Sequence, residues 1–215
     1  AASDVYKRQI IASINVHITN PAIALLLTNA VPVVIIEYNK VVGVMHPYFA
    51  HGTVITRREQ FMAYEDHRGI TLAQAFVKGP LITKANLLAS YARNRKETKP
   101  SLAEELMNDA KQIKALAVDI DYLAGDKYTL RNQLMGIEGN GTRIYYEAIA
   151  KILPEEYGFE KRIKRPPKDP INAALSYGYV ILDSRCLLQI VAAGLDPYAG
   201  YLHADRSGRP SLALD

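Results

Sequence analysis

A helical spacing of apolar residues dominates the chain from about residue 56 onward. Apolar side chains recur there every three or four positions, which is typical of amphipathic helices that bury one face. The spacing continues through Gly136, Gly139 and Gly141 within the segment 129–153. Because its phase is preserved, one continuous helix is favoured over a helix broken at the glycines. We therefore expect a mainly helical protein.

Particular residues predict where some of these helices end. Asp169 is a good N-cap, Pro170 suits the first helical position, and Gly194 is a typical residue just past a helix end. Pro80 lies inside the helical segment 69–95. Since proline lacks a backbone N–H, we expect it to break or kink this helix.

The N-terminal region is rich in β-branched residues instead. The stretches IIASINVHI, VPVVIIEY and VVGVMHPY predict three strands. The apolar run at 21–38 is the candidate for a membrane span, but Asn29, Pro32 and Glu37 interrupt it, and it changes from leucine-rich to β-branched. We expect a short helix that leads into a buried strand, and no membrane contact.

Three strands and one helix cannot bury both faces of a sheet. Residues 1–55 are therefore expected to be the remaining part of a larger β domain, in which the polar residues 1–9 are a non-native scar outside the fold. Residues 56–215 are expected to form a helical domain that is truncated at its C-terminus. The predicted fold class is α+β, mainly α: a truncated N-terminal β domain followed by an all-helical C-terminal domain.

Charge and cysteine content bear on partners and compartment. The net charge of +4 and the pI of about 9.0 are compatible with a nucleic-acid partner without requiring one. The segment KRIKRPPK at 161–168 holds five cations and no acid, so it is either a DNA-binding loop or a solvated one. Cys186 is the single cysteine, which excludes an internal disulfide and favours a reducing cytoplasm and a buried structural thiol.

Three residues are candidate metal ligands. Glu138 lies within GIEGNG, where glycines leave room for a phosphate; His203 follows an aromatic run; and Asp215 lies in the first turn of a helix. Each also has a structural interpretation: a solvated glutamate, a packed histidine, and an acid favoured by the helix dipole. Together they provide a mixed oxygen and nitrogen site suited to Mn²⁺ or Mg²⁺. Arg206 and Arg209 would then clamp the phosphate that the metal polarises.

Four blocks resemble a known family in order and spacing: MGIEG (135–139), RPPKDPINAALSYGYVIL (165–182), GLDPYAGYLH (194–203) and GRPSLALD (208–215). They resemble the CRISPR-associated adaptation integrases, antiviral endonucleases that insert new spacers. Upstream, NVHITNPAIALLLTNAVPVVIIEYNK is similar to the end of the family's N-terminal β domain. The resemblance covers roughly residues 10–215.

This resemblance implies a homodimer whose helical, metal-binding C-terminal domain carries one divalent cation, Mg²⁺ or Mn²⁺. It implies Glu138, His203 and Asp215 as metal ligands and catalytic residues, with a further acid about one turn beyond Asp215. The implied activity is cleavage of DNA, and attack of a captured DNA 3′-hydroxyl on a phosphodiester of the repeat array. The implied partners are DNA and the small ferredoxin-like second adaptation protein.

The residues that would bind DNA are Arg206, Arg209, Lys161, Arg162, Lys164 and Arg165. Two other functions stay open: a transposon-encoded integrase of the same fold, and a non-catalytic helical DNA-binding scaffold. Because the last metal acid and the opening strands are expected to be missing, we expect this 215-residue chain to be poorly active alone.

Overall fold

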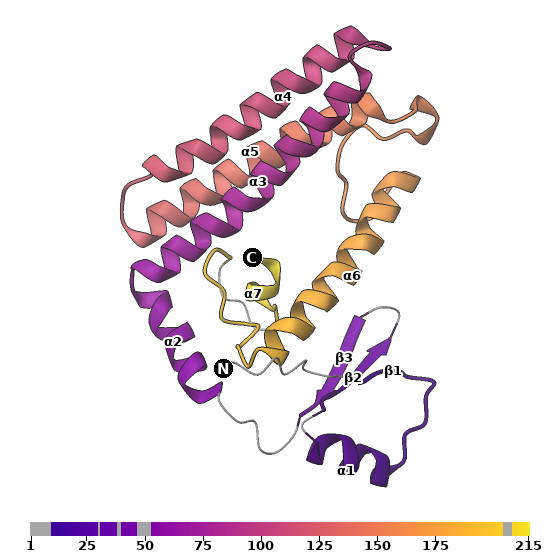
Figure 1. The fold of residues 1–215 in the computed structure, drawn as a ribbon, viewed down its shortest axis with the longest axis vertical. Coiled ribbons are helices and arrows are strands. Elements are labelled where there is room, and N and C mark those ends of the chain that lie inside the picture. Colours follow the sequence, from indigo (N-terminus) through magenta and orange to yellow (C-terminus); the bar gives the residue numbers. More distant parts are fainter. Residues whose placement is uncertain (1–9, 30, 38–39, 47–52, 204–207) are drawn as a thin grey trace. The chain divides into compact units, whose positions relative to one another are not determined.

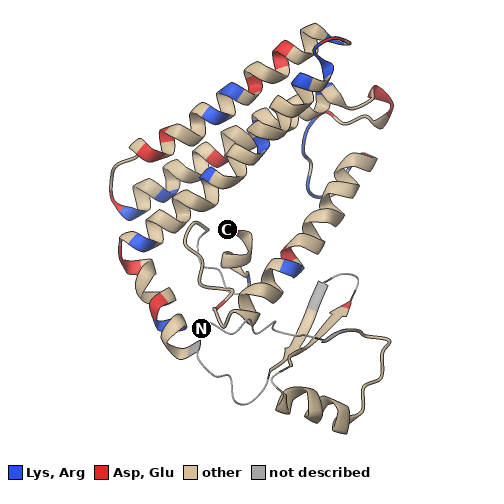
Figure 2. Cartoon of the chain, in the orientation of Figure 1, with Lys and Arg blue, Asp and Glu red and all other residues tan. Residues whose placement is uncertain are grey.

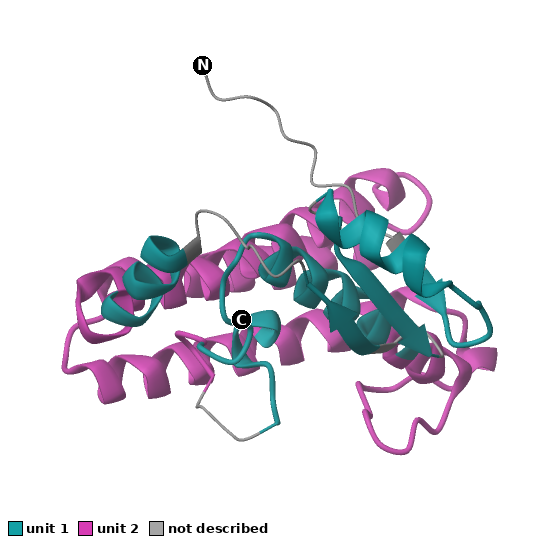
Figure 3. Ribbon diagram, turned by 90° about the horizontal axis from the view of Figure 1, so that it is seen from below, with its two compact units in different colours: residues 1–62, 177–199, 205–214 teal, residues 63–176, 200–204, 215 magenta. Residues whose placement is uncertain are grey.

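The structure is a computed structural model that describes residues 10–29, 31–37, 40–46, 53–203 and 208–215. It is mainly helical with one small sheet, as the sequence predicts (Figure 1). The chain divides into two compact units, coloured separately in Figure 3. Unit 1 comprises residues 1–62, 177–199 and 205–214, and unit 2 comprises residues 63–176, 200–204 and 215. The expected domain boundary near residue 55 stays a prediction.

The three predicted strands of unit 1 form one sheet in the order β1-β2-β3, with bounds Ile10–Ser13, Val33–Glu37 and Lys40–Met45. β1 pairs with β2 in parallel, and β2 pairs with β3 antiparallel. The short helix α1 (Asn20–Thr28) precedes β2, and Val33 and Val34 are each 1% exposed, so the predicted helix leading into a buried strand is confirmed. No helix among the described residues combines the length and the apolar character that a membrane span requires.

Two side chains of α2 (Thr53–Glu65) hold the segment that follows Gly194 in unit 1. The buried Gln60 amide donates to the carbonyl oxygens of Asp196 at 2.8 Å and Ala199 at 3.1 Å, and it accepts from the Asp196 backbone N–H at 2.8 Å. Arg57 Nε donates to the Gly194 carbonyl at 2.9 Å. These bonds satisfy loop backbone groups that would otherwise be buried at a cost.

Unit 2 is built on three long helices that pack side by side (Figure 1). The connecting segments contain the 3₁₀ turns Ile120–Tyr122 and Glu155–Tyr157. The core consists of apolar residues at helical spacing, among them Leu81, Leu88, Leu106, Ile113 and Leu134, all fully buried. The three helices are α3 (His67–Arg95), α4 (Pro100–Asp119) and α5 (Lys127–Ile152).

The expected break at Pro80 does not occur, because α3 continues through it, and the alternative of a kink there stays a prediction. An interior proline costs roughly 3 kcal/mol. Val77 and Leu81 on either side are completely buried, and burying one such side chain contributes about 1.5–3 kcal/mol, so packing offsets the loss. Other expectations are confirmed: α5 runs unbroken through its glycines, and α6 (Pro170–Ala192) begins after Asp169. The Asp169 carboxylate accepts from the Asn172 N–H at 2.8 Å.

Gly141 and Gly139 should respond in opposite ways to replacement by alanine. A Cβ at Gly141 would collide with the Leu81 side chain of α3, whereas one at Gly139 meets nothing within 4 Å. We expect Gly141→Ala to lower the free energy of unfolding by about 1–3 kcal/mol through overpacking. Gly139→Ala should raise it by about 0.5–1 kcal/mol, since alanine favours a helix. Urea unfolding followed by circular dichroism measures both; equal midpoints would contradict the packing argument.

Candidate active site

The clearest feature of the candidate site is the Asp215 carboxylate, which gathers the loop that carries His203. Its Oδ2 accepts from the backbone N–H groups of Tyr201 at 2.6 Å and Leu202 at 3.0 Å. Its Oδ1 accepts from the backbone N–H of His203 at 2.9 Å and lies 2.8 Å from His203 Nδ1. The Asp215 side chain has no exposed surface, and that of His203 is 17% exposed. Asp215 directly follows the short helix α7 (Ser211–Leu214).

These contacts bear on the ionisation of Asp215 and on the tautomer of His203. Burial raises the pKa of Asp215, but the hydrogen bonds from His203, Leu202 and Tyr201 together lower it by more. The net shift of the Asp215 pKa is therefore downward. An ionised carboxylate only accepts hydrogen bonds, so the proton of a neutral His203 ring must lie on Nδ1. His203 Nε2 then keeps its lone pair. A histidine whose other nitrogen donates to a carboxylate is the usual form of a metal ligand.

Arg131 binds the same loop through a backbone carbonyl group. From α5, its Nε donates to the Leu202 carbonyl at 3.0 Å, and its Nη1 donates to the Tyr64 hydroxyl at 3.1 Å. Lys127 Nζ lies 3.3 Å from the centroid of the Tyr64 ring, a cation–π contact that helps to fix this ring. The backbone at 201–203 is therefore held by the Asp215 carboxylate and by the Arg131 guanidinium.

Glu138 lies on α5, seven residues after Arg131, or about 10 Å along the helix. Its side chain is partly exposed, and a Cβ at Gly136 or Gly139 would meet nothing, so these glycines leave open space beside it. No group of three or more His, Cys, Asp and Glu side chains within the described ranges is arranged to hold a metal ion. The structure thus joins His203 to Asp215 but not Glu138 to both, and the three-ligand set stays a prediction.

The donor chemistry fits a divalent cation at two of the three predicted ligands. His203 offers a nitrogen with a lone pair, and Glu138 offers carboxylate oxygens beside open space. Asp215 differs, because each of its two oxygens already receives two donors. In this arrangement Asp215 orients His203.

The predicted DNA-binding residues fall into three groups. Lys161, Lys164 and Arg165 are exposed on the loop before α6, which Figure 2 shows as basic. Arg209 is partly exposed, and its carbonyl accepts from the Ser211 hydroxyl at 3.5 Å. Arg206 lies outside the described residues. The roles of these residues in binding DNA stay predictions.

Arg162 has a structural role that the sequence did not predict. Its guanidinium donates to Asn172 Oδ1 at 3.0 Å and to the Ser176 hydroxyl at 3.1 Å. Asn172 is completely buried, accepts from the Ile163 N–H at 2.8 Å and donates to the Lys161 carbonyl at 2.8 Å. Arg162 and Asn172 therefore fasten the basic loop to the start of α6, while its neighbours carry their charge into solvent.

Lys84 is a second residue that sequence reasoning missed. Its Nζ donates to the Thr142 hydroxyl at 2.7 Å, which links α3 to α5 beside Glu138. A signal was present, because Lys84 falls three residues after the buried Leu81 and four before the buried Leu88. That register places a lysine on the apolar face of the helix.

Comparison with known proteins places this chain in a defined group. The sequence profile of the family described as "CRISPR associated protein Cas1" matches residues 6–215. The "CRISPR-associated endonuclease Cas1 1" of Archaeoglobus fulgidus is 42% identical over 207 residues, which cover 92% of this chain and 59% of that protein. A protein of the same description from Thermus thermophilus is 37% identical over 209 residues, covering 94% and 56%. The chain thus spans less than two thirds of the length of these relatives.

Two solved structures share the fold. One is described as "Casposase bound to integration product", with a TM-score of 0.64 and 26% identity over 96% of this chain and 55% of that one. The other is described as "Partial Cas6-RT-Cas1--Cas2 complex", with a TM-score of 0.65 and 27% identity over 96% of this chain and 60% of that one.

Proposed function

The chain belongs to the CRISPR associated protein Cas1 family, and from this membership we propose its function. The protein that contains it is a divalent-metal-dependent DNA endonuclease and integrase, and it inserts captured DNA into a CRISPR array by transesterification of a phosphodiester. The match over residues 6–215 carries this proposal. The bond between His203 and Asp215 supports it, because it leaves one histidine nitrogen available to a metal.

Each residue has a definite part in this proposal. His203 Nε2 and the Glu138 carboxylate hold Mg²⁺ or Mn²⁺, and Asp215 orients the histidine ring. The bound cation supplies neutralisation of the charge on the scissile phosphate. Arg206 and Arg209 hold that phosphate, and Lys161, Lys164 and Arg165 follow the DNA backbone.

The proposed partners are DNA, a second copy of the chain and the small ferredoxin-like adaptation protein. Two similar structures support DNA and the protein partner, since one is described as bound to an integration product and the other as a Cas1–Cas2 complex. A cytoplasmic location is part of the same proposal.

A transposon-encoded integrase is the second candidate, and the similarity to a casposase favours it. Genomic neighbourhood distinguishes the two. A repeat array with the partner gene nearby supports the adaptation integrase, and terminal inverted repeats with a polymerase gene support the transposon enzyme.

Metal removal tests the proposed chemistry. We expect the full-length protein to nick and join branched DNA with Mn²⁺ or Mg²⁺, to lose both activities in EDTA and to recover them when Mn²⁺ is restored. Gel analysis of labelled branched DNA measures the products, and titration calorimetry measures Mn²⁺ binding. Salt-dependent DNA binding without Mn²⁺ binding or cleavage would instead identify a non-catalytic scaffold.

A further inference from the structure

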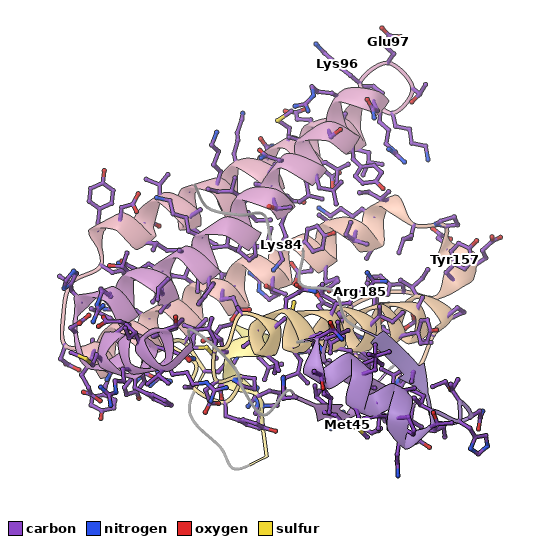
Figure 4. All side chains as sticks on the ribbon, turned by 60° about the horizontal axis from the view of Figure 1, so that its bottom comes forward. Met45, Lys84, Lys96, Glu97, Tyr157 and Arg185 are labelled. Carbon is purple, nitrogen blue, oxygen red and sulfur yellow. The ribbon has the colours of Figure 1, made fainter. Side chains whose placement is uncertain are left out.

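The ammonium group of Lys84 occupies an unusual position for a lysine. It extends from the middle of α3, where Figure 4 labels it, and donates to Thr142 Oγ1 at 2.7 Å. Thr142 lies on α5 one turn after Glu138. The Tyr145 ring, with its centroid 6.0 Å from Nζ, lies on the same stretch of α5. Lys84 thus stands between two helices, beside a predicted metal ligand.

This position disfavours a positive charge. Burial lowers the pKa of Lys84, and the Glu138 carboxylate counters that shift only in part. Among the described residues, Lys84 forms no ion pair within 4.0 Å, and Thr142 accepts the single hydrogen bond of Nζ. An ammonium has three N–H donors, so two remain available to a ligand. A half-buried cation that keeps unused donors is a candidate binding group.

Lys78 provides the contrast within the same helix. Its Nζ bonds both carboxylate oxygens of Asp121 on the surface of the bundle. Lys78, six residues before Lys84, therefore forms an ordinary surface ion pair with Asp121. The difference between the two lysines is the absence of a bonded counter-anion at Lys84 within the part of the chain that the structure describes.

We propose that Lys84 binds a phosphate oxygen of the DNA backbone beside Glu138. The inference deepens the proposed function and rests on it. A phosphate oxygen of the DNA backbone is an anionic acceptor for the N–H donors that the Lys84 ammonium keeps after bonding Thr142. Thr142 holds the ammonium in place for this contact.

The test measures DNA binding in EDTA, where no cleavage occurs. Affinity of the full-length protein for a labelled branched DNA is measured across a range of salt concentrations. We expect Lys84→Gln to weaken binding about 5–10-fold and to reduce the slope of log affinity against log salt by about 1, the value for one phosphate contact. Lys84→Arg should keep the slope. Lys78→Gln, the matched control, should keep both slope and affinity.

Each outcome has a separate meaning. An unchanged slope in Lys84→Gln would overturn the phosphate contact, while cleavage by the wild-type protein with Mn²⁺ would still support the nuclease. A reduced slope together with a wild-type protein that does not cleave DNA would retain the phosphate site and reject the nuclease. Circular dichroism melting verifies that the variants fold. If glutamine lowers the melting temperature, Lys84→Met serves as the neutral variant, because it suits a half-buried position.

Discussion

Replacing Glu138 by glutamine is expected to slow DNA nicking by the full-length protein at least about 10³-fold. Glutamine has no anionic oxygen, so the metal would lose a charged ligand, and about 4 kcal/mol of transition-state stabilisation corresponds to this factor. The fold should be unaffected, because Glu138 is partly exposed and glutamine suits a helix as well as glutamate does. Single-turnover nicking with Mn²⁺ measures the rate, and calorimetry measures Mn²⁺ affinity.

Glu147→Gln is the matched control for this experiment. Glu147 lies on the same helix and pairs with Arg143 at 2.8 Å, and its side chain is 51% exposed. Loss of this pair should cost about 0.3–0.5 kcal/mol of stability and leave nicking unchanged. Full activity in Glu138→Gln would show that Glu138 is not a ligand. Equal losses in both variants would point to a general effect of charge on DNA binding.

Much of the fold could be predicted from the sequence, because its signals are local. The unbroken phase across the glycines predicted α5, and Asp169, Pro170 and Gly194 predicted the limits of α6. The β-branched runs predicted all three strands. The absence of a break at Pro80 has a different origin: a proline's local preference is overridden by side chains that pack on α4 and α5, which are distant along the chain.

The candidate site was only partly accessible to sequence reasoning. Residue type identified His203 and Asp215 as candidate metal ligands, and the structure brings these two side chains together. However, the Asp215 carboxylate is bound mainly by backbone N–H groups, which every non-proline residue has and which leave no sequence signal. The same holds for Arg131, whose target is the Leu202 carbonyl. The basic run at 161–168 likewise hid the structural role of Arg162.

Replacing Asp215 by asparagine should separate a residue that orients His203 from one that only stabilises the loop. An amide has one accepting oxygen, and its NH₂ group would face backbone N–H donors. At least one buried donor would then lack an acceptor, which costs about 1–3 kcal/mol of stability. His203 Nδ1 would lose its anionic acceptor as well. We expect Mn²⁺ affinity to fall about 10–100-fold and nicking to fall by about 10².

Acid titration of stability provides a readout that does not depend on activity. The folded-state pKa of Asp215 is lowered, so the carboxylate contributes stability above its unfolded pKa of about 3.9, and this contribution is lost as pH falls through the folded value. Asp215→Asn lacks this group and should lose less stability than the wild-type protein as pH falls below about 4. Urea unfolding at each pH measures the difference.

Asp109→Asn is the control for Asp215→Asn, since Asp109 lies on α4 and pairs with Lys151 of α5 at 3.2 Å. It should leave Mn²⁺ affinity and nicking unchanged. A drop in stability with wild-type Mn²⁺ affinity in Asp215→Asn would mean that the carboxylate only holds the loop. A loss of Mn²⁺ affinity beyond 100-fold would instead make Asp215 a direct ligand, because orientation of the histidine alone does not account for so large an effect.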